Sequence, residues 1–218
     1  QEEKQVLNRP QEPKKPYPYY EEEVKFKNEG ADIELAGTLT LPSKDGQYPV
    51  AILITGSGAQ NRDEELLGHK PFLIISDYLT RNGIGVLRYD DRGTASSTGN
   101  FKAATSADFA TDVLSAIAYL KTRNEVKKDQ IGLIGHSEGG MIAPMVASKS
   151  KDIAFAVLLA GPGVPITDLM AKQLELISLA NGESEESVQE DLKVMTKAYE
   201  MVKNSKDVET LQSDLSEY

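Results

Sequence analysis

A serine lies between two glycines in the segment Gly135-His136-Ser137-Glu138-Gly139. This is the G-x-S-x-G spacing, in which a strand turns sharply into a helix and presents the serine hydroxyl as a nucleophile. Side chains at the two glycine positions would collide with the neighbouring strand and helix, and glycine avoids both collisions. The segment therefore predicts Ser137 as a catalytic nucleophile. The other interpretation is a glycine-rich turn with an idle serine.

A nucleophilic serine that attacks a carbonyl needs donors for the negative charge that develops on oxygen. The amide of Glu138 would lie at the start of the following helix, where it favours an anion. The segment Thr55–Ala59 is glycine-rich, and we assign the second donor to the amide of Ser57, with Gly58 or Ala59 as neighbours that would take the role instead. A plain turn or phosphate loop is the alternative, although the lysine of a P-loop is missing.

The serine also needs a base, and the sequence contains two histidines, His69 and His136. His136 immediately precedes Ser137, so we expect its side chain to leave the turn in another direction and to be packed or to line the pocket wall. His69 is expected to be a loop histidine bonded to backbone, with a role as the base as the alternative. Two histidines so placed, without any cysteine, predict no metal site, and no cofactor is expected.

Hydrophobic patterning predicts the elements that position these residues. Two alternating segments that flank a glycine turn predict a hairpin over Glu22–Asn28 and Asp32–Leu41. Continuous apolar runs predict strands buried on both faces, as in a parallel sheet. These runs are Val50–Ile54, Gly85–Tyr89, Ile131–Ile134 and Ile153–Leu159.

Helical patterns separate the apolar runs. They are expected over Lys70–Asn82, Thr105–Thr122 and Met141–Ser148, and this alternation predicts an α/β sheet covered on both faces. After residue 162 the helical pattern continues without a strand signal. We therefore predict an extended Pro-rich arm over 1–20, the α/β core over 21–162 and a helical segment over 163–218.

Three stretches carry a family resemblance: "LITGSGAQNRDE" from Leu53, "GVLRYDDRGTASSTG" from Gly85 and "IGLIGHSEGG" from Ile131. In this order they resemble the α/β-hydrolase fold, and within it bacterial esterases related to dienelactone hydrolase and to the acyl-CoA thioesterase and bile-acid acyltransferase group. The resemblance implies a mostly parallel sheet with an N-terminal antiparallel hairpin, helices on both faces and a following helical lid.

The stretch "YDDRGTASSTG" resembles the Asp-x-Arg-Gly-x-Gly-x-Ser loop of that family. The resemblance implies that Asp91 and Arg92, together with Asp90, are structural and tie the loop beneath the site by charge-assisted hydrogen bonds. Ala95 stands where the family usually has glycine.

In the family the triad runs Ser, then Asp or Glu, then His along the chain. No histidine follows His136. The resemblance therefore implies that the catalytic Asp and His lie outside this chain, in a fold truncated after the helical lid. The last strand would then have an open edge, which is an aggregation hazard. We expect the missing C-terminal fragment or a second copy of the chain to cover it.

The resemblance implies a serine hydrolase that acts on small acyl esters through an acyl-enzyme. Acyl-CoA thioesterase, acyltransferase and prolyl-type peptidase activities would use the same parts. The alternative from another class is a non-catalytic fragment or binding scaffold.

Charge and composition limit the partners. The net charge of −10 would repel phosphates, so nucleic acid and anionic membranes are not expected as partners. No apolar run reaches the roughly 20 residues that span a bilayer. The chain begins at Gln1 without a methionine, which favours a cleaved export signal and a periplasmic or extracellular bacterial protein. An artificial boundary and a cytoplasmic location stay open.

Overall fold

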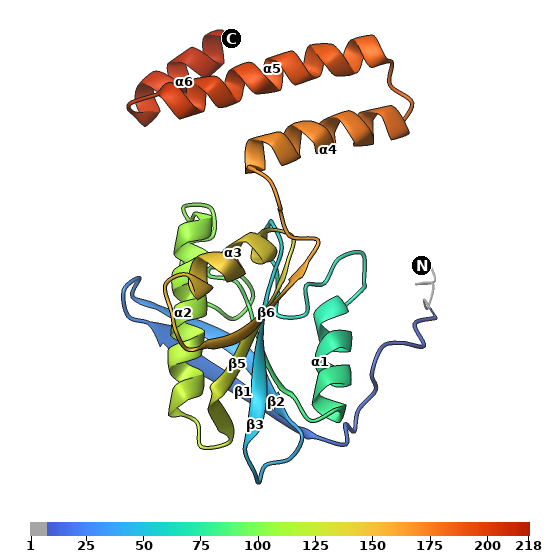
Figure 1. Ribbon diagram of the computed structural model, residues 1–218, viewed down its shortest axis with the longest axis vertical. Coiled ribbons are helices and arrows are strands. Elements are labelled where there is room, and N and C mark those ends of the chain that lie inside the picture. Colours follow the sequence, from blue (N-terminus) through green and yellow to red (C-terminus); the bar gives the residue numbers. More distant parts are fainter. Residues whose placement is uncertain (1–7) are drawn as a thin grey trace, which may run out of the picture. The chain divides into compact units, whose positions relative to one another are not determined.

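A computed structural model describes residues 8–218 of the chain, whose centre is a six-stranded sheet with the strand order β1-β2-β4-β3-β5-β6 (Figure 1). The strands are β1 (Tyr20–Asn28), β2 (Ile33–Leu41), β3 (Tyr48–Ile54), β4 (Gly85–Tyr89), β5 (Val126–His136) and β6 (Ile153–Leu159). β1, β2 and β4 pair antiparallel, and β4, β3, β5 and β6 pair parallel. The predicted α/β class, with an N-terminal antiparallel pair on a mostly parallel sheet, is confirmed.

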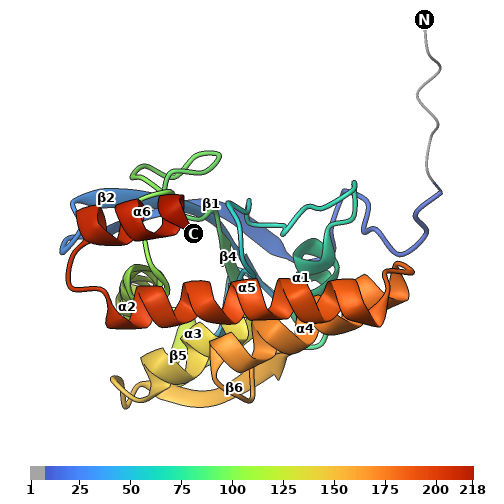
Figure 2. The same ribbon diagram turned by 90° about the horizontal axis from the view of Figure 1, so that it is seen from above.

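Helices cover both faces of this sheet. α2 (Ser106–Thr122) and α3 (Glu138–Ala147) lie on one face, and α1 (Pro71–Arg81) lies on the other (Figure 2). Successive residues of β3 alternate between the two layers, because side chains of a strand point to opposite faces. Ile52 belongs to the core beneath α2 and α3, whereas Leu53 belongs to the core with Phe72 of α1.

The largest differences from the sequence prediction lie in β5 and α3. β5 is predicted over Ile131–Ile134 and extends over Val126–His136, since Tyr48 of β3 pairs with Val126 across a register shift. α3 is predicted from Met141 and begins at Glu138. Its first turn holds two glycines, which carry little helical propensity, so tertiary packing decides where the helix begins.

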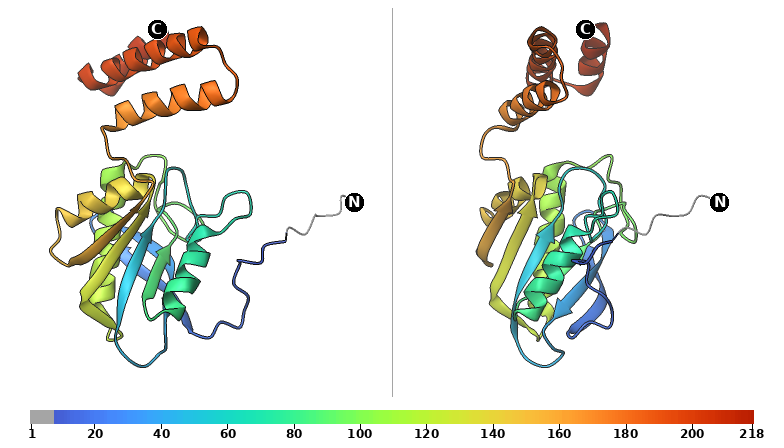
Figure 3. Two further views of the ribbon diagram at one scale, coloured as in Figure 1. Left: turned by 45° about the vertical axis from the view of Figure 1, so that its right-hand side comes forward. Right: turned by 90° about the vertical axis from the view of Figure 1, so that its right-hand side faces the viewer.

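The chain divides into two compact units, Gln1–Gly161 and Pro162–Tyr218. The second unit consists of α4 (Ile166–Ala180), α5 (Glu185–Asn204) and α6 (Val208–Glu217), in which α5 packs on both other helices (Figure 3). Ser184 caps α5 by accepting from the Ser187 amide at 3.2 Å, and Asp207 caps α6 by accepting from the Thr210 amide at 2.7 Å. The role of this unit as a lid stays a prediction.

The described part of the N-terminal arm, residues 8–19, runs through turns and bends before β1 begins. The rings of Tyr17 and Tyr19 stack with their centroids 5.1 Å apart. The remainder of the predicted arm, residues 1–7, lies outside the described residues. Within residues 8–218, no helix combines the length and apolar character that crossing a membrane requires.

Candidate active site

Ser137 stands between β5 and α3 in a backbone conformation that non-glycine residues rarely adopt. Its φ is 51° and its ψ is −113°. Its amide donates to the Leu159 carbonyl at 2.9 Å, and its carbonyl accepts from the Gly140 amide at 2.9 Å. Strained backbone of this kind costs about 1–3 kcal/mol and persists where surrounding contacts over-determine it.

Glycines around the serine allow three backbone segments to meet. A β-carbon on Gly135 would lie 2.0 Å from the Gly139 carbonyl oxygen, and one on Gly139 would lie 2.2 Å from the Ile54 carbonyl oxygen. A β-carbon on Gly140 would lie 2.6 Å from the Cα atom of Gly161. The ends of β3 and β5 and the start of α3 therefore touch main chain to main chain, which fixes the direction in which Ser137 leaves the sheet.

Ser137 opens onto a groove of about 400 Å³ at the carboxyl ends of the parallel strands. The groove also brings together Ser57, His69 and His136 of the predicted site residues. The other lining residues come from the loop after β3 and the start of α1, and are Gly56, Gln60, Glu64, Leu66, Leu67 and Pro71. Gly58 is adjacent to Ser57 with a φ of +97°, but it does not line the groove.

Two amides beside Ser137 have no acceptor. Within residues 8–218, neither the Ser57 amide nor the Glu138 amide donates a hydrogen bond. Glu138 is the first residue of α3, where amides have no partner inside the helix and the dipole favours negative charge. These amides are the donors predicted from the sequence, and their geometry towards a bound carbonyl stays a prediction.

The two histidines have different surroundings. His69 exchanges two backbone hydrogen bonds with Leu66, at 2.9 and 3.0 Å. The His136 imidazole lies 2.8 Å through Nδ1 from Oε1 of Glu64. In the described part of the chain, the Ser137 hydroxyl makes no hydrogen bond to either ring, so this structure does not assemble a serine–histidine pair.

Glu64 is a site residue that the sequence analysis missed. Its side chain is buried, and its Oε1 accepts from the Gly56 amide at 2.7 Å as well as facing His136. In the sequence it stands between Asp63 and Glu65, and nothing distinguishes it from these acids. Its positive φ of 51° is the feature that sets it apart, and no pattern of residue types encodes that angle.

The loop after β4 forms hydrogen bonds that hold the loop after β3 in place. Asp91 accepts from the Thr55 hydroxyl at 2.7 Å and from the Gln60 amide at 2.9 Å. Arg92 forms a bidentate pair with Asp112 of α2, at 2.7 and 2.8 Å. Ala95 has a φ of 46°, so it takes the left-handed conformation that the resemblance associates with glycine.

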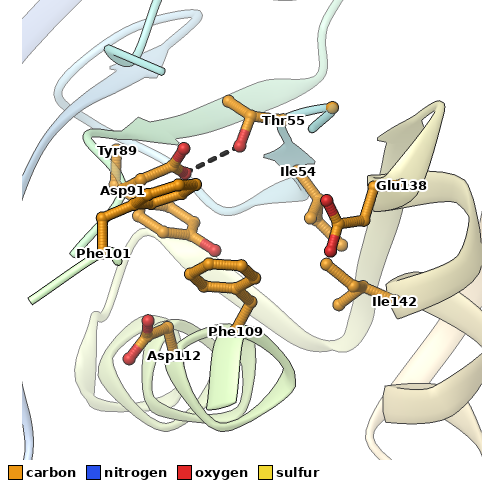
Figure 4. A pocket seen from close by; sticks show the side chains of 10 residues that line it. Ile54, Thr55, Tyr89, Asp91, Phe101, Phe109, Asp112, Glu138 and Ile142 are labelled. Atoms are coloured by element: carbon orange, nitrogen blue, oxygen red, sulfur yellow. Dashed lines mark hydrogen bonds between the residues drawn. The ribbon is translucent and has the colours of Figure 1, made fainter. Parts of the chain in front are cut away.

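A small cavity of about 10 Å³ lies next to Thr55 (Figure 4). This volume is about the smallest that can hold one water molecule. Asp91, Asp112 and Glu138 line it together with Tyr89, Phe101 and Phe109. Burial, with smaller contributions from the charges of Asp112 and Glu138, raises the pKa of Asp91 to about 7 against the hydrogen bonds from Thr55 and Gln60.

Among residues 8–218, no three His, Asp or Glu side chains are grouped so as to hold a metal ion. The Glu138 carboxylate accepts a hydrogen bond from the Ser106 hydroxyl at 2.6 Å.

Comparison with known families and proteins shows that this chain is similar to hydrolases. Residues 72–215 match the family described as "Serine aminopeptidase, S33". Esterase EstD of Thermotoga maritima is 31% identical over 163 residues, which cover 75% of this chain and 38% of EstD. A putative carboxymethylenebutenolidase of Synechocystis is 31% identical over 140 residues, which cover 62% of this chain and 56% of that protein. The matched part of the chain thus spans 38% and 56% of the lengths of these two relatives.

Solved structures share the fold. Pyrococcus furiosus esterase Pf2001 superposes with a TM-score of 0.59 at 20% identity, over 78% of this chain and 59% of that one. Est1E of Butyrivibrio proteoclasticus, solved with ferulic acid bound, superposes with a TM-score of 0.51 at 27% identity, over 60% of this chain and 49% of that one.

Proposed function

Because the chain belongs to the serine aminopeptidase S33 family of α/β-hydrolases, we propose that it is a serine hydrolase that cleaves carboxylic esters through Ser137. The resemblance inferred from the sequence motifs is thereby confirmed at the level of the family. The observation that carries the proposal is the strained Ser137 at the edge of the groove, next to two amides without acceptors.

In the proposed reaction, a general base takes the proton of the Ser137 hydroxyl as its oxygen bonds to the acyl carbon, and the carbonyl π electrons move onto the carbonyl oxygen. The amides of Ser57 and Glu138 donate to that oxyanion, which favours the tetrahedral intermediate over the bound ester. The intermediate expels the alcohol, which takes a proton from a general acid, and water then hydrolyses the acyl-enzyme by the same route.

The general base and its orienting acid are proposed to lie on chain outside these 218 residues. Within residues 8–218, neither histidine is hydrogen-bonded to Ser137, and Nδ1 of His136 already faces Glu64. The outer edge of β6 also supports the proposal, since Phe155, Val157 and Leu158 along this strand are exposed. A further strand of the same protein, or a second copy, would cover that edge.

A fluorophosphonate probe tests the nucleophile directly, because it modifies an activated serine with loss of fluoride. The natural gene product, which would carry the proposed base, is the protein to label. Mass spectrometry should place its adduct on Ser137, and Ser137→Ala should abolish it. Ser148→Ala, which removes an exposed hydroxyl at the end of α3, is the matched control and should label like the wild type. An adduct on another residue, or none at any probe concentration, would refute the proposal.

A second measurement locates the base. Hydrolysis of a p-nitrophenyl ester is compared between the 218-residue chain and the natural gene product. We expect the shorter chain to be slower by at least about 100-fold, since general acid–base catalysis contributes roughly 10²–10⁴-fold. Equal rates would show that the base lies within these residues.

Peptide hydrolysis is the second candidate, because the family description names an aminopeptidase. The same acyl-enzyme chemistry cleaves amides when the leaving amine is protonated. Assaying aminoacyl p-nitroanilides and acyl thioesters beside the p-nitrophenyl ester separates these activities, and preference for the ester is expected.

A further inference from the structure

Glu64 is a buried acid that has no role in the ester hydrolysis proposed for Ser137. Its side chain is 7% exposed, and its backbone has a φ of 51°. A charged group out of water and a non-glycine residue at positive φ both cost free energy. Other contacts must offset these costs, and those contacts lie at the nucleophile.

One carboxylate oxygen of Glu64 joins the two segments that build the site. Oε1 accepts from the Gly56 amide at 2.7 Å, and Gly56 directly precedes Ser57. The same oxygen lies 2.8 Å from Nδ1 of His136, which directly precedes Ser137. A β-carbon on Gly56 would lie 3.2 Å from Nδ1 of His136 and 3.3 Å from the β-carbon of Ser137, so the two segments are already in contact there.

This contact selects the tautomer of His136. An ionised carboxylate has no proton to donate, so Nδ1 must carry the hydrogen. In the neutral ring Nε2 is then an acceptor on the far side from Glu64. The imidazole is 45% exposed and lines the groove, so its free side is accessible to a bound molecule.

We propose that Glu64 is a positioning residue for the reaction of Ser137. It holds the segment of the Ser57 amide at a fixed distance from the nucleophile, and it keeps His136 in the Nδ1–H form beside the serine. The part of this proposal that concerns reaction rate rests on the proposed function of Ser137, whereas the part that concerns His136 does not.

The tautomer of His136 is measurable by ¹⁵N NMR, because protonated and unprotonated ring nitrogens differ widely in chemical shift. The sequence contains two histidines, so His69→Gln identifies the remaining signals as those of His136. Spectra recorded at rising pH, until the shifts stop changing, report the neutral ring. We expect Nδ1–H in the wild type and in Glu65→Gln, a charge-matched control at the exposed neighbour. Glu64→Gln should show a weaker Nδ1–H preference, because an amide oxygen accepts less strongly than a carboxylate and the amide nitrogen can instead donate to Nδ1.

Reactivity is measured as the rate of fluorophosphonate labelling at Ser137. Glu64→Gln should slow it by about 10-fold to 100-fold relative to Glu65→Gln, because misplacement of a reacting group by about 1 Å costs on the order of 100-fold. Thermal unfolding of both variants checks that the folded state is retained.

An Nε2–H tautomer in the wild type would overturn the proposal, and so would equal labelling of the two variants. If Glu64→Gln does not fold, the tautomer of the wild type still decides. If Ser137 does not label in any protein, the proposed function fails, but the tautomer continues to test the Glu64–His136 pair.

Discussion

Asp91 is a carboxyl group whose surroundings favour its protonated form. Burial raises its pKa to about 7, against an ordinary value of 3.8 for the free side chain. The folded protein binds this proton more tightly than the unfolded chain does. The stabilisation of the folded state by protonated Asp91 is therefore complete below about pH 4. It is lost as the pH rises from about 4 to about 7.

Replacement of Asp91 tests this dependence. The free energy of unfolding of the wild type should fall relative to that of Asp91→Asn between pH 4 and pH 8, by on the order of 4 kcal/mol. Urea denaturation at a series of pH values measures the difference. Asp129→Asn, at an exposed strand position, is the control and should show a constant difference from the wild type. A constant difference for Asp91→Asn as well would contradict the assignment.

The sequence indicated the residues of the site better than their contacts. Ser137, Ser57 and His136 were predicted to lie close together, and the structure brings them to one groove. Glu64 was missed, because its part depends on a backbone angle and on a partner 72 residues away, and neither is encoded locally. His136 was expected to be packed or to line a pocket wall, but its carboxylate partner was not predicted.

At the scale of elements, the packing of α3 against β3 depends on the absence of a side chain. Gly139→Ala would place a β-carbon 2.2 Å from the Ile54 carbonyl oxygen and 2.7 Å from that of Thr55. Because both atoms are main chain, the helix must shift, at an expected cost of about 2–4 kcal/mol in the free energy of unfolding. Chemical denaturation measures this change.

Gly163→Ala is the matched control. A β-carbon there meets no atom within 4 Å, and the residue has no positive φ. Its free energy of unfolding should stay within about 0.5 kcal/mol of the wild type. Equal stability of the two variants would show that α3 is not held by this close approach.

Elements with strong periodicity were predicted with nearly their observed bounds. β6 was predicted and found over Ile153–Leu159, and the helix predicted over Lys70–Asn82 is α1, Pro71–Arg81. The prediction was wrong at the start of α3 and at the start of β5. There the backbone conformation is imposed by neighbouring strands rather than by the residues themselves, as the pairing of Val126 with Tyr48 shows.

At the scale of the whole molecule, β6 ends the sheet with an unpaired edge in the described part of the chain. An apolar edge strand is a template for another strand. We expect the wild type to self-associate with rising concentration, and Val157→Lys to shift the association constant by about 10-fold, since a charge on an edge strand opposes pairing. Sedimentation equilibrium measures the constant.

The control for this experiment is Val194→Lys, an exposed valine on α5. It adds the same charge away from the edge and should leave the association constant unchanged. If both variants weaken association equally, net charge rather than strand pairing is responsible. If the wild type is monomeric at all concentrations, the edge is not a site of self-association.

The order of the strands has a consequence for synthesis on the ribosome. Every pairing in the sheet joins segments made before residue 160, so the nascent chain holds all of these partners before α4 is translated. The Ser137 amide, however, donates to the carbonyl of Leu159, the last residue of β6. The serine is translated 22 residues earlier than that partner. Its reactive geometry is therefore completed only after the other strands can already have paired.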